Sequence, residues 1–199
     1  MHQAFGLAPV RRALADHRAV ALPDQAVARA AVALLLRPAG PDDCELLLIH
    51  RAEHPEDPWS GHMALPGGRV DPGEAHALQA AEREVREEVA VDLGRCGRLL
   101  GALDEVGATA RGRRVPLIIA PYVFELTEPV DPRPNHEVQA LYWVALTALC
   151  DPMAATTRRV RYDGREHLLP GIRVGTEVIW GLTYQMLQRF FALLDDNAR

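Results

Sequence analysis

GGRVDPGEAHALQAAEREVREEVAV, residues 67–91, is the stretch around which the rest of the chain is organised. It opens with a glycine-rich turn, and the residues that follow predict a helix of about four turns. Glu84, Glu87 and Glu88 stand at spacing i, i+3, i+4, which makes them neighbours on one helix face. An adjoining apolar stripe predicts the face that packs against a sheet: Leu78, Ala81, Val85 and Val89.

Three carboxylates on one helix face repel one another, and such crowding favours a bound cation. Ligation by oxygen atoms alone points to Mg²⁺ or Mn²⁺ rather than to zinc. The alternative is a solvated helix face on which Arg83 and Arg86 neutralise the neighbouring glutamates. The helix by itself does not separate these two interpretations.

The segment that precedes the helix favours the metal site. Residues 65–74 contain three glycines and two prolines. Glycine allows the backbone to approach a ligand closely and to adopt positive φ, so its amide and carbonyl groups can join a metal or phosphate site. A glycine-rich turn at a set distance before Arg-Glu-x-x-Glu-Glu is a far more specific signal than either part alone.

This combination resembles the signature of the Nudix hydrolases. The matching positions are Gly68, Glu74, Arg83, Glu84, Val85, Glu87, Glu88 and Val91. The chain departs from the signature twice, because eight residues separate Glu74 from Arg83 and because Ala90 replaces the final glycine. Both departures also occur in the coenzyme A pyrophosphatase-like branch, which the chain resembles in this respect.

The resemblance implies an α/β fold, the Nudix α/β/α sandwich with a mixed sheet, over a core of about residues 27–150. We expect a single domain over residues 1–199, in which an N-terminal helix and a C-terminal hairpin and helix pack on this core. The segment Ile179–Thr183 also resembles the coenzyme A pyrophosphatase-like branch. A homodimer is compatible with this organisation.

The resemblance also implies roles for the residues of the signature. In the family, the glutamates that match Glu84, Glu87 and Glu88 bind the divalent cations, with help from the backbone carbonyl of the glycine that matches Gly67. Arg83 would fix the Glu84 carboxylate by an ion pair. The implied reaction is metal-dependent hydrolysis of a diphosphate, with Mg²⁺ or Mn²⁺ as the cofactor.

Three residues outside this set are candidates for catalysis or substrate binding. The general base varies across the family, and Glu137 is our candidate; the alternative is an ordinary carboxylate at the start of a strand. Arg51 ends a predicted strand, where Nudix enzymes often use a basic residue on phosphate; the alternative is a surface salt bridge. Arg69, within the turn, is a further expected contact with the substrate.

A basic cluster lies farther along the chain, at Arg111, Arg113 and Arg114. The planar guanidinium group suits phosphate because it can make two charge-assisted hydrogen bonds. We hypothesise that one or two of these arginines hold nucleotide phosphates of the substrate. The alternative is a solvated loop that only offsets Asp104 and Glu105.

The expected substrate is coenzyme A or a derivative, from the resemblance to the branch that cleaves it. Arg51-Ala52, Gly61 and Pro66-Gly67-Gly68 correspond to that branch's motif. However, Asp57 stands where the motif has an arginine, and Leu65 replaces a phenylalanine. ADP-ribose, dinucleotides and nucleotide sugars are the alternative substrates, and a Nudix-fold module that senses a nucleotide without cleaving it is the non-enzymatic alternative.

Composition narrows the class of protein. The net charge is −5, from 22 basic and 27 acidic residues, so nothing favours bulk binding to nucleic acid. The three cysteines lack CxxC spacing, which favours free thiols in a reducing compartment. No run approaches 18 apolar residues, and the first residues lack the apolar core of a signal peptide. We therefore expect a cytoplasmic protein with a small-molecule nucleotide as its partner, not a membrane.

Periodicity and turn residues predict the remaining elements. Strands are expected over residues 29–36, 44–51, 98–103, 115–126 and 138–144, and short helices over residues 9–18 and 145–150. Residues 107–114 are expected to form a loop, and Pro121 suggests an edge or a bulge in its strand. Asp163-Gly164 predicts a hairpin turn, and residues 177–194 predict a C-terminal helix whose apolar stripe is core.

Overall fold

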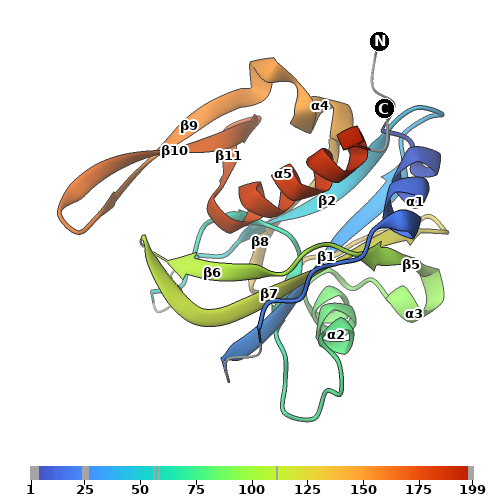
Figure 1. Cartoon of the computed structure of the whole chain (residues 1–199), viewed down its shortest axis with the longest axis horizontal. Coiled ribbons are helices and arrows are strands. Elements are labelled where there is room, and N and C mark those ends of the chain that lie inside the picture. Colours follow the sequence, from blue (N-terminus) through green and yellow to red (C-terminus); the bar gives the residue numbers. More distant parts are fainter. Residues whose placement is uncertain (1–4, 24–26, 56, 58, 111, 197–199) are drawn as a thin grey trace.

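The structure, a computed structural model, describes residues 5–23, 27–55, 57, 59–110 and 112–196. Figure 1 labels its elements along the chain. The helices are α1 (Leu7–Asp16), α2 (Ala77–Val89), α3 (Leu93–Cys96), α4 (Leu146–Cys150) and α5 (Gly181–Asp196), with a 3-10 turn at Pro152–Ala154. None of the helices in these ranges is long and apolar enough to cross a membrane.

A mixed sheet forms the centre of the molecule. Its strands are β1 (Ala28–Pro38), β2 (Cys44–Arg51), β3 (Met63–Ala64), β4 (Gly67–Arg69), β5 (Gly97–Ala102), β6 (Val106–Ala110), β7 (Arg113–Leu126) and β8 (Val138–Ala145). The long strands β1 and β7 run parallel, and the other paired strands of this sheet are antiparallel. The continuous apolar runs of β1 and β2 follow from burial on both faces.

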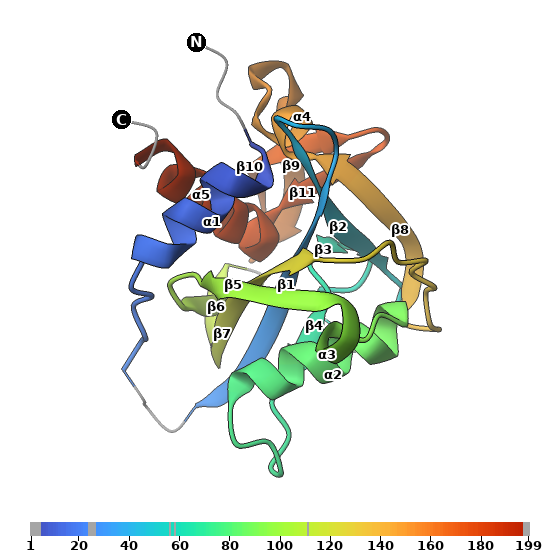
Figure 2. The same ribbon diagram turned by 90° about the vertical axis from the view of Figure 1, so that its right-hand side faces the viewer.

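Alternate side chains of β1 show how the two faces are covered. Leu34 and Leu36 join the core that includes residues of α1 and α5, whereas Ala33 and Leu35 join the core beneath α2. Figure 2 shows α2 on one side of the sheet and α1 with α5 on the other. This arrangement confirms the α/β sandwich with a mixed sheet, an N-terminal helix and a C-terminal extension.

The strands β1 and β2 separate within the sheet. They pair only between Leu36–Pro38 and Cys44–Leu46. The short strands β3 and β4 occupy the gap beyond this point: β3 pairs with Ile49 and His50 of β2, and β4 pairs with Ala30–Val32 of β1. The glycine turn is therefore part of the sheet and lies directly beside α2.

The C-terminal region adds a second sheet. β9 (Ala155–Tyr162) and β10 (Arg165–Val174) form the expected hairpin. Asp163 and Gly164 at its turn have φ values of 51° and 73°, the positive angles that a type I′ turn requires. β11 (Glu177–Trp180) pairs with β10 and leads into α5.

The predicted helix over residues 177–194 is wrong at its start. Glu177–Trp180 is the strand β11, and α5 begins at Gly181, whose φ of 64° separates strand from helix. Val178 and Ile179 are β-branched and lie opposite Arg173 and Ile172 of β10. Their apolar side chains fitted the helical period, but pairing with β10 decided their conformation.

The loop predicted over residues 107–114 is also wrong. Most of these residues belong to strands β6 and β7, which pair as far as Ala110 and Arg113. Arg111, between these two residues, lies outside the described residues.

Pro121 does not mark an edge strand, because β7 pairs on both sides. Pro121 lies opposite Val32 of β1. On the other side its carbonyl accepts a hydrogen bond from Leu103 at 2.9 Å, just beyond the end of β5 and before β6 begins. The missing N–H of the proline therefore falls at a gap in the ladder, where it removes no strand pairing.

The three cysteines are free thiols in the structure. Cys44 and Cys96 are buried, and Cys150 is partly buried. Burial raises the pKa of Cys44 and of Cys150 to about 12. Because the thiolate is the reactive form, these two side chains are inert near neutral pH.

Candidate active site

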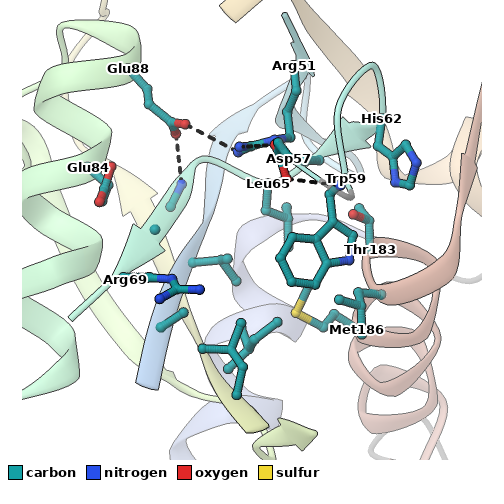
Figure 3. Close-up of a pocket in the computed structure, with 18 of the residues that line it drawn as sticks. Arg51, Asp57, Trp59, His62, Leu65, Arg69, Glu84, Glu88, Thr183 and Met186 are labelled. Carbon is teal, nitrogen blue, oxygen red and sulfur yellow. Dashed lines mark hydrogen bonds and ion pairs between the residues drawn. The ribbon is translucent and has the colours of Figure 1, made fainter. Parts of the chain in front are cut away.

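A pocket of about 390 Å³ opens between the glycine turn and the start of α5 (Figure 3). One end carries the carboxylates of Glu84, Glu88 and Glu137. Trp59 and Met186 lie at the other end, beside Asp57, His62 and Thr183 (Figure 3). The lining also includes the apolar side chains of Leu65, Leu117, Ile119, Trp180 and Leu182. These two ends suit a ligand that joins a charged group to a less polar one.

Two glycines allow the turn to lie against its neighbours. Gly67 has a φ of 152°, and a Cβ there would lie 2.2 Å from the carbonyl oxygen of Ala31 in β1. A Cβ at Gly68 would lie 2.2 Å from Oε1 of Glu84. A side chain at either position would push the turn off the sheet or displace a carboxylate of the pocket.

Glu88 is a buried carboxylate with only partial compensation of its charge. Its side chain is 2% exposed. Oε2 accepts a hydrogen bond from the Gly67 amide at 2.8 Å, and Nη1 of Arg51 lies 3.8 Å from Oε1. Burial raises the pKa of Glu88 to about 7, although the Gly67 amide and Arg51 act in the opposite direction.

Arg83 ties the glycine turn to α2. Its guanidinium donates to Glu74 at 2.9 Å, to Glu84 at 2.8 Å, to Glu87 at 3.1 Å and to the carbonyl of Arg69 at 2.9 Å. The expected ion pair between Arg83 and Glu84 is therefore present. Glu74 also bonds to Arg83, although eight residues separate the two in the sequence. Burial nevertheless raises the pKa of Glu84, because it outweighs the effect of Arg83.

The groups expected to hold a metal are partly assembled. Gly67, Glu84 and Glu88 line the pocket, whereas Glu87 pairs with Arg83 and its side chain is 53% exposed. Within the described part of the chain, no three Asp, Glu, His or Cys side chains are close enough to hold an ion. The donors that do meet are carboxylate and backbone oxygens, which fit Mg²⁺ or Mn²⁺. That Glu87 is a ligand stays a prediction.

Arg51 lies between two carboxylates at the wall of the pocket. It donates to Oδ2 of Asp57 from Nη2 at 2.7 Å and from Nε at 3.2 Å. Oδ1 of Asp57 accepts from the Trp59 amide at 3.0 Å. Figure 3 shows Glu88, Arg51, Asp57 and Trp59 as one connected row of interactions. The cation expected to meet phosphate is therefore already paired.

Comparison with known proteins places this geometry in a family. Residues 27–163 match the NUDIX domain, and these residues include the glycine turn, α2 and the carboxylate end of the pocket. The chain belongs to the Nudix family. Its domain is that of a Nudix hydrolase, a class of pyrophosphatases.

Comparison with individual proteins shows how far the similarity extends. An uncharacterized protein of Schizosaccharomyces pombe is 36% identical over 126 residues, which are 62% of this chain and 38% of that protein. The chain thus spans less than half the length of this relative. A MutT/nudix family protein from Enterococcus faecalis shares the fold with a TM-score of 0.57 at 19% identity, over 95% of this chain and 70% of that one. An Ap4A hydrolase from C. elegans is 28% identical over 61% of this chain and 82% of that one, with a TM-score of 0.47.

Two further predicted residues lie in the Nudix pocket. Glu137 lines it just before β8, and its negative charge contributes to the raised pKa values of Glu84 and Glu88. Arg69 lines it from β4. Both positions are compatible with the predicted roles as general base and substrate contact, which stay predictions.

Two residues of the basic cluster, Arg113 and Arg114, are described by the structure. Neither Arg113 nor Arg114 is among the described residues that line the pocket. Arg113 pairs with Asp163 of the β9–β10 turn at 3.0 Å, with side chains 77% and 59% exposed. The hairpin tips touch there, because Gly112 lies against the ring of Tyr162. Contact of these arginines with phosphate stays a hypothesis.

The apolar stripe of α5 was predicted to be core, and Met186 is buried there with Leu182 packed against it. What the prediction missed is that both side chains also line the pocket, together with Thr183 of α5 and Trp180 of β11. The ring of Trp180 lies against that of His62, with centroids 4.3 Å apart. The resemblance at Ile179–Thr183 was the available signal, but no periodicity reveals which side of a helix meets a cavity.

Proposed function

We propose that the chain is a divalent-metal-dependent pyrophosphohydrolase that cleaves the diphosphate of coenzyme A or of a derivative. The runner-up substrates are ADP-ribose, dinucleotides and nucleotide sugars. The observation that carries the proposal is the arrangement of the pocket lining, in which Glu84 and Glu88 face the apolar side chains of Trp59 and Met186 across the cavity (Figure 3). A coenzyme A molecule has the matching arrangement, a diphosphate joined to a long pantetheine arm.

The C-terminal region supplies the support for this substrate. Trp180, Leu182 and Met186 would contact the pantetheine arm, since they form apolar lining beyond the carboxylates. Asp57 argues against coenzyme A as the substrate, because the motif of the coenzyme A branch has a cation at this position. Asp57 also pairs with Arg51, which leaves that cation less available to a phosphate. Arg69 would then be the main side-chain cation for the diphosphate.

The carboxylate end would hold the metal. Glu84 and Glu88 offer carboxylate oxygens and Gly67 its carbonyl, while Arg83 orients Glu84 through the bond at 2.8 Å. When bound, a divalent cation neutralises the diphosphate and makes water more acidic. Arg83 also holds Glu87, so a shift of one guanidinium would move two carboxylates together.

Glu137 is the proposed general base. It lines the same end of the pocket, and its side chain is 56% exposed, so water can reach it. In this role the carboxylate takes one proton from the attacking water while the water oxygen bonds to phosphorus. The bond from phosphorus to the bridging oxygen then breaks, and the second phosphate group leaves.

A substrate panel tests the proposal. The protein is incubated with Mg²⁺ or Mn²⁺ and with coenzyme A, dephospho-coenzyme A, ADP-ribose, a dinucleoside polyphosphate and a nucleotide sugar, and products are identified by mass. Cleavage of coenzyme A to phosphopantetheine and adenosine 3′,5′-bisphosphate is expected, with the highest kcat/KM in the panel. A Glu88→Gln variant is the matched control for contaminating hydrolases.

Two results would contradict the proposal in different ways. If ADP-ribose or a nucleotide sugar were cleaved with a higher kcat/KM than coenzyme A, the proposed reaction would stand and the proposed substrate would be wrong. Tight binding of one nucleotide without hydrolysis in either metal would replace the enzyme with a sensing module.

A further inference from the structure

Arg51 is held unequally by its two carboxylate partners. Its bonds to Asp57, at 2.7 Å and 3.2 Å, are within hydrogen-bond range. Its distance to Oε1 of Glu88, 3.8 Å, is beyond that range. Asp57 therefore fixes the direction of the Arg51 guanidinium. Glu88 interacts with the guanidinium through electrostatic attraction but accepts no hydrogen bond from it.

Asp57 is itself fixed by the loop that precedes β3. Oδ1 accepts from the Trp59 amide at 3.0 Å, and the Asp57 carbonyl accepts from the Ser60 amide at 3.1 Å. The Asp57 side chain is 19% exposed, so water competes weakly for it. Hydrogen bonds to the loop therefore hold the aspartate in the position from which it pairs with Arg51.

Among the described residues, the carboxylates within 4 Å of the Arg51 guanidinium are those of Asp57 and Glu88, so loss of Asp57 would leave Glu88. The two side chains are mostly buried, at 28% exposure for Arg51 and 2% for Glu88. Attraction between opposite charges is strong in such surroundings, so the guanidinium would close onto Oε1. A guanidinium bonded to Oε1 would repel a divalent cation from the same carboxylate.

We propose that Asp57 is a positioning residue, which holds Arg51 away from Glu88 and so leaves the Glu88 carboxylate open to a divalent cation. This inference rests on the proposed metal-dependent function. It gives Arg51 a role other than the phosphate contact that its strand-end position suggested. It also gives a reason for an acidic residue beside a diphosphate pocket, where a carboxylate would otherwise only repel the substrate.

Binding of Mn²⁺ to the substrate-free protein tests this role apart from turnover. Free Mn²⁺ is measured by electron paramagnetic resonance for the wild type and for Asp57→Asn, Arg51→Gln and the double variant. Asparagine keeps the size of aspartate and an oxygen for the Trp59 amide. The matched control is Glu53→Gln, in the same loop, whose carboxylate accepts from Ser60 at 2.9 Å and does not line the pocket.

The expected pattern is specific to restraint of Arg51. Asp57→Asn weakens Mn²⁺ binding about tenfold, as loss of a supporting partner of a metal site typically does. Arg51→Gln does not weaken it, because the competitor is gone. The double variant regains the affinity of Arg51→Gln, and Glu53→Gln matches the wild type.

Other patterns overturn the inference. Unchanged Mn²⁺ affinity in Asp57→Asn would show that Arg51 stays in place without its anchor. Equal weakening in Asp57→Asn and in the double variant would show that Asp57 acts only through the loop, and circular dichroism would show whether the fold is intact. Absence of Mn²⁺ binding and of hydrolysis in the wild type would instead remove the proposed function itself.

Discussion

Residues 67–89 and residues 177–196 line opposite sides of one pocket, but different forces hold them in place. On the first side, Gly67 and Gly68 admit no side chain, and Arg83 joins several carboxylates. On the second side, apolar side chains such as Leu182 and Met186 pack without directional bonds.

The difference predicts how each side tolerates change. Hydrogen bonds and ion pairs in a crowded site depend on position, so small shifts there remove function. Apolar packing adapts when volume and pattern are kept. We therefore expect substitutions on the first side to lower kcat or stability, and substitutions on the second side to change KM and substrate preference.

The largest expected effect is on the carboxylate side. Glu88→Gln removes the charge of the most buried carboxylate in the pocket and should lower kcat by at least about 100-fold, as loss of a charge-stabilising group does. We expect the same order of loss for Glu87→Gln, although that side chain is 53% exposed. Steady-state kinetics in saturating Mn²⁺ measures both.

Leu182→Ala is the matching substitution on the apolar side. It should raise KM more than it lowers kcat, because contact with a remote part of the substrate contributes to binding in the ground and transition states alike. If Leu182→Ala lowered kcat as much as Glu88→Gln, the distinction between the two sides would fail. Glu82→Gln is the charge control for Glu88→Gln, because Glu82 is also in α2 and does not line the pocket.

The glycine turn should give the next largest effect, on stability. Gly67→Ala places a Cβ 2.2 Å from the carbonyl oxygen of Ala31 in β1. We expect the free energy of unfolding to fall by about 3 kcal/mol, at the upper range for overpacking. Gly73→Ala is the control, because no atom lies within 4 Å of its Cβ and its φ is not positive. Urea denaturation that gave both variants equal stability would contradict this account of the turn.

His62, in the loop before β3, lies against Trp180 of the second side and should give a moderate dependence of stability on pH. Burial lowers the pKa of His62 from 6.5 to about 4, against the opposing charge of Asp57. Between these values the unfolded chain binds the proton and the folded chain does not, so stability falls as pH decreases from 6.5 towards 4.

His62→Gln removes this titration and should flatten the decline in stability. His136→Gln is the matched control, since that side chain is 88% exposed. Urea denaturation at several pH values in this interval measures the difference from the wild type. An identical pH dependence in His62→Gln and in the wild type would mean that the ring is protonated without cost in the folded state.

The smallest expected effect is at the contact between the hairpin tips. Arg113→Ala with Arg114→Ala should change the free energy of unfolding by less than about 1 kcal/mol, as is usual for an exposed ion pair. Asp163→Asn is the matched control, because it removes the same ion pair without removing a cation, and asparagine tolerates the φ of 51° at this turn position. A rise in KM in the arginine variant alone, with kcat kept, would assign these arginines to substrate phosphate, and an unchanged KM would assign them to the surface.

Much of the fold could be predicted because local chemistry and tertiary packing agree there. Residues 44–51 form a strand with the predicted bounds, since an unbroken apolar run is buried on both faces. Asp163-Gly164 forms the predicted turn because both residues accept positive φ. Val85 and Val89 of α2 are fully buried, as the helical period required.

The errors arise where two local patterns were compatible with the same residues. Val178 and Ile179 fitted a helix until β10 offered strand pairing. Pro121 suggested an edge or a bulge, yet β7 pairs on both sides and the missing N–H falls between β5 and β6. Neither outcome can be read from neighbours in the sequence, because the deciding partner is a distant strand.

The sequence by itself determined the family, the α/β class and the identity of the acidic helix face, because glycines and charges at fixed spacing act through the local backbone. Tertiary structure alone decided which of those carboxylates are buried: Glu88 lies under the turn, whereas Glu87 faces Arg83 and solvent. It also decided that Arg51 pairs with Asp57 and that α5 forms a wall of the pocket. The physical reason is that burial and ion pairing depend on elements brought together from across the chain, and these set the charge and shape that a substrate meets.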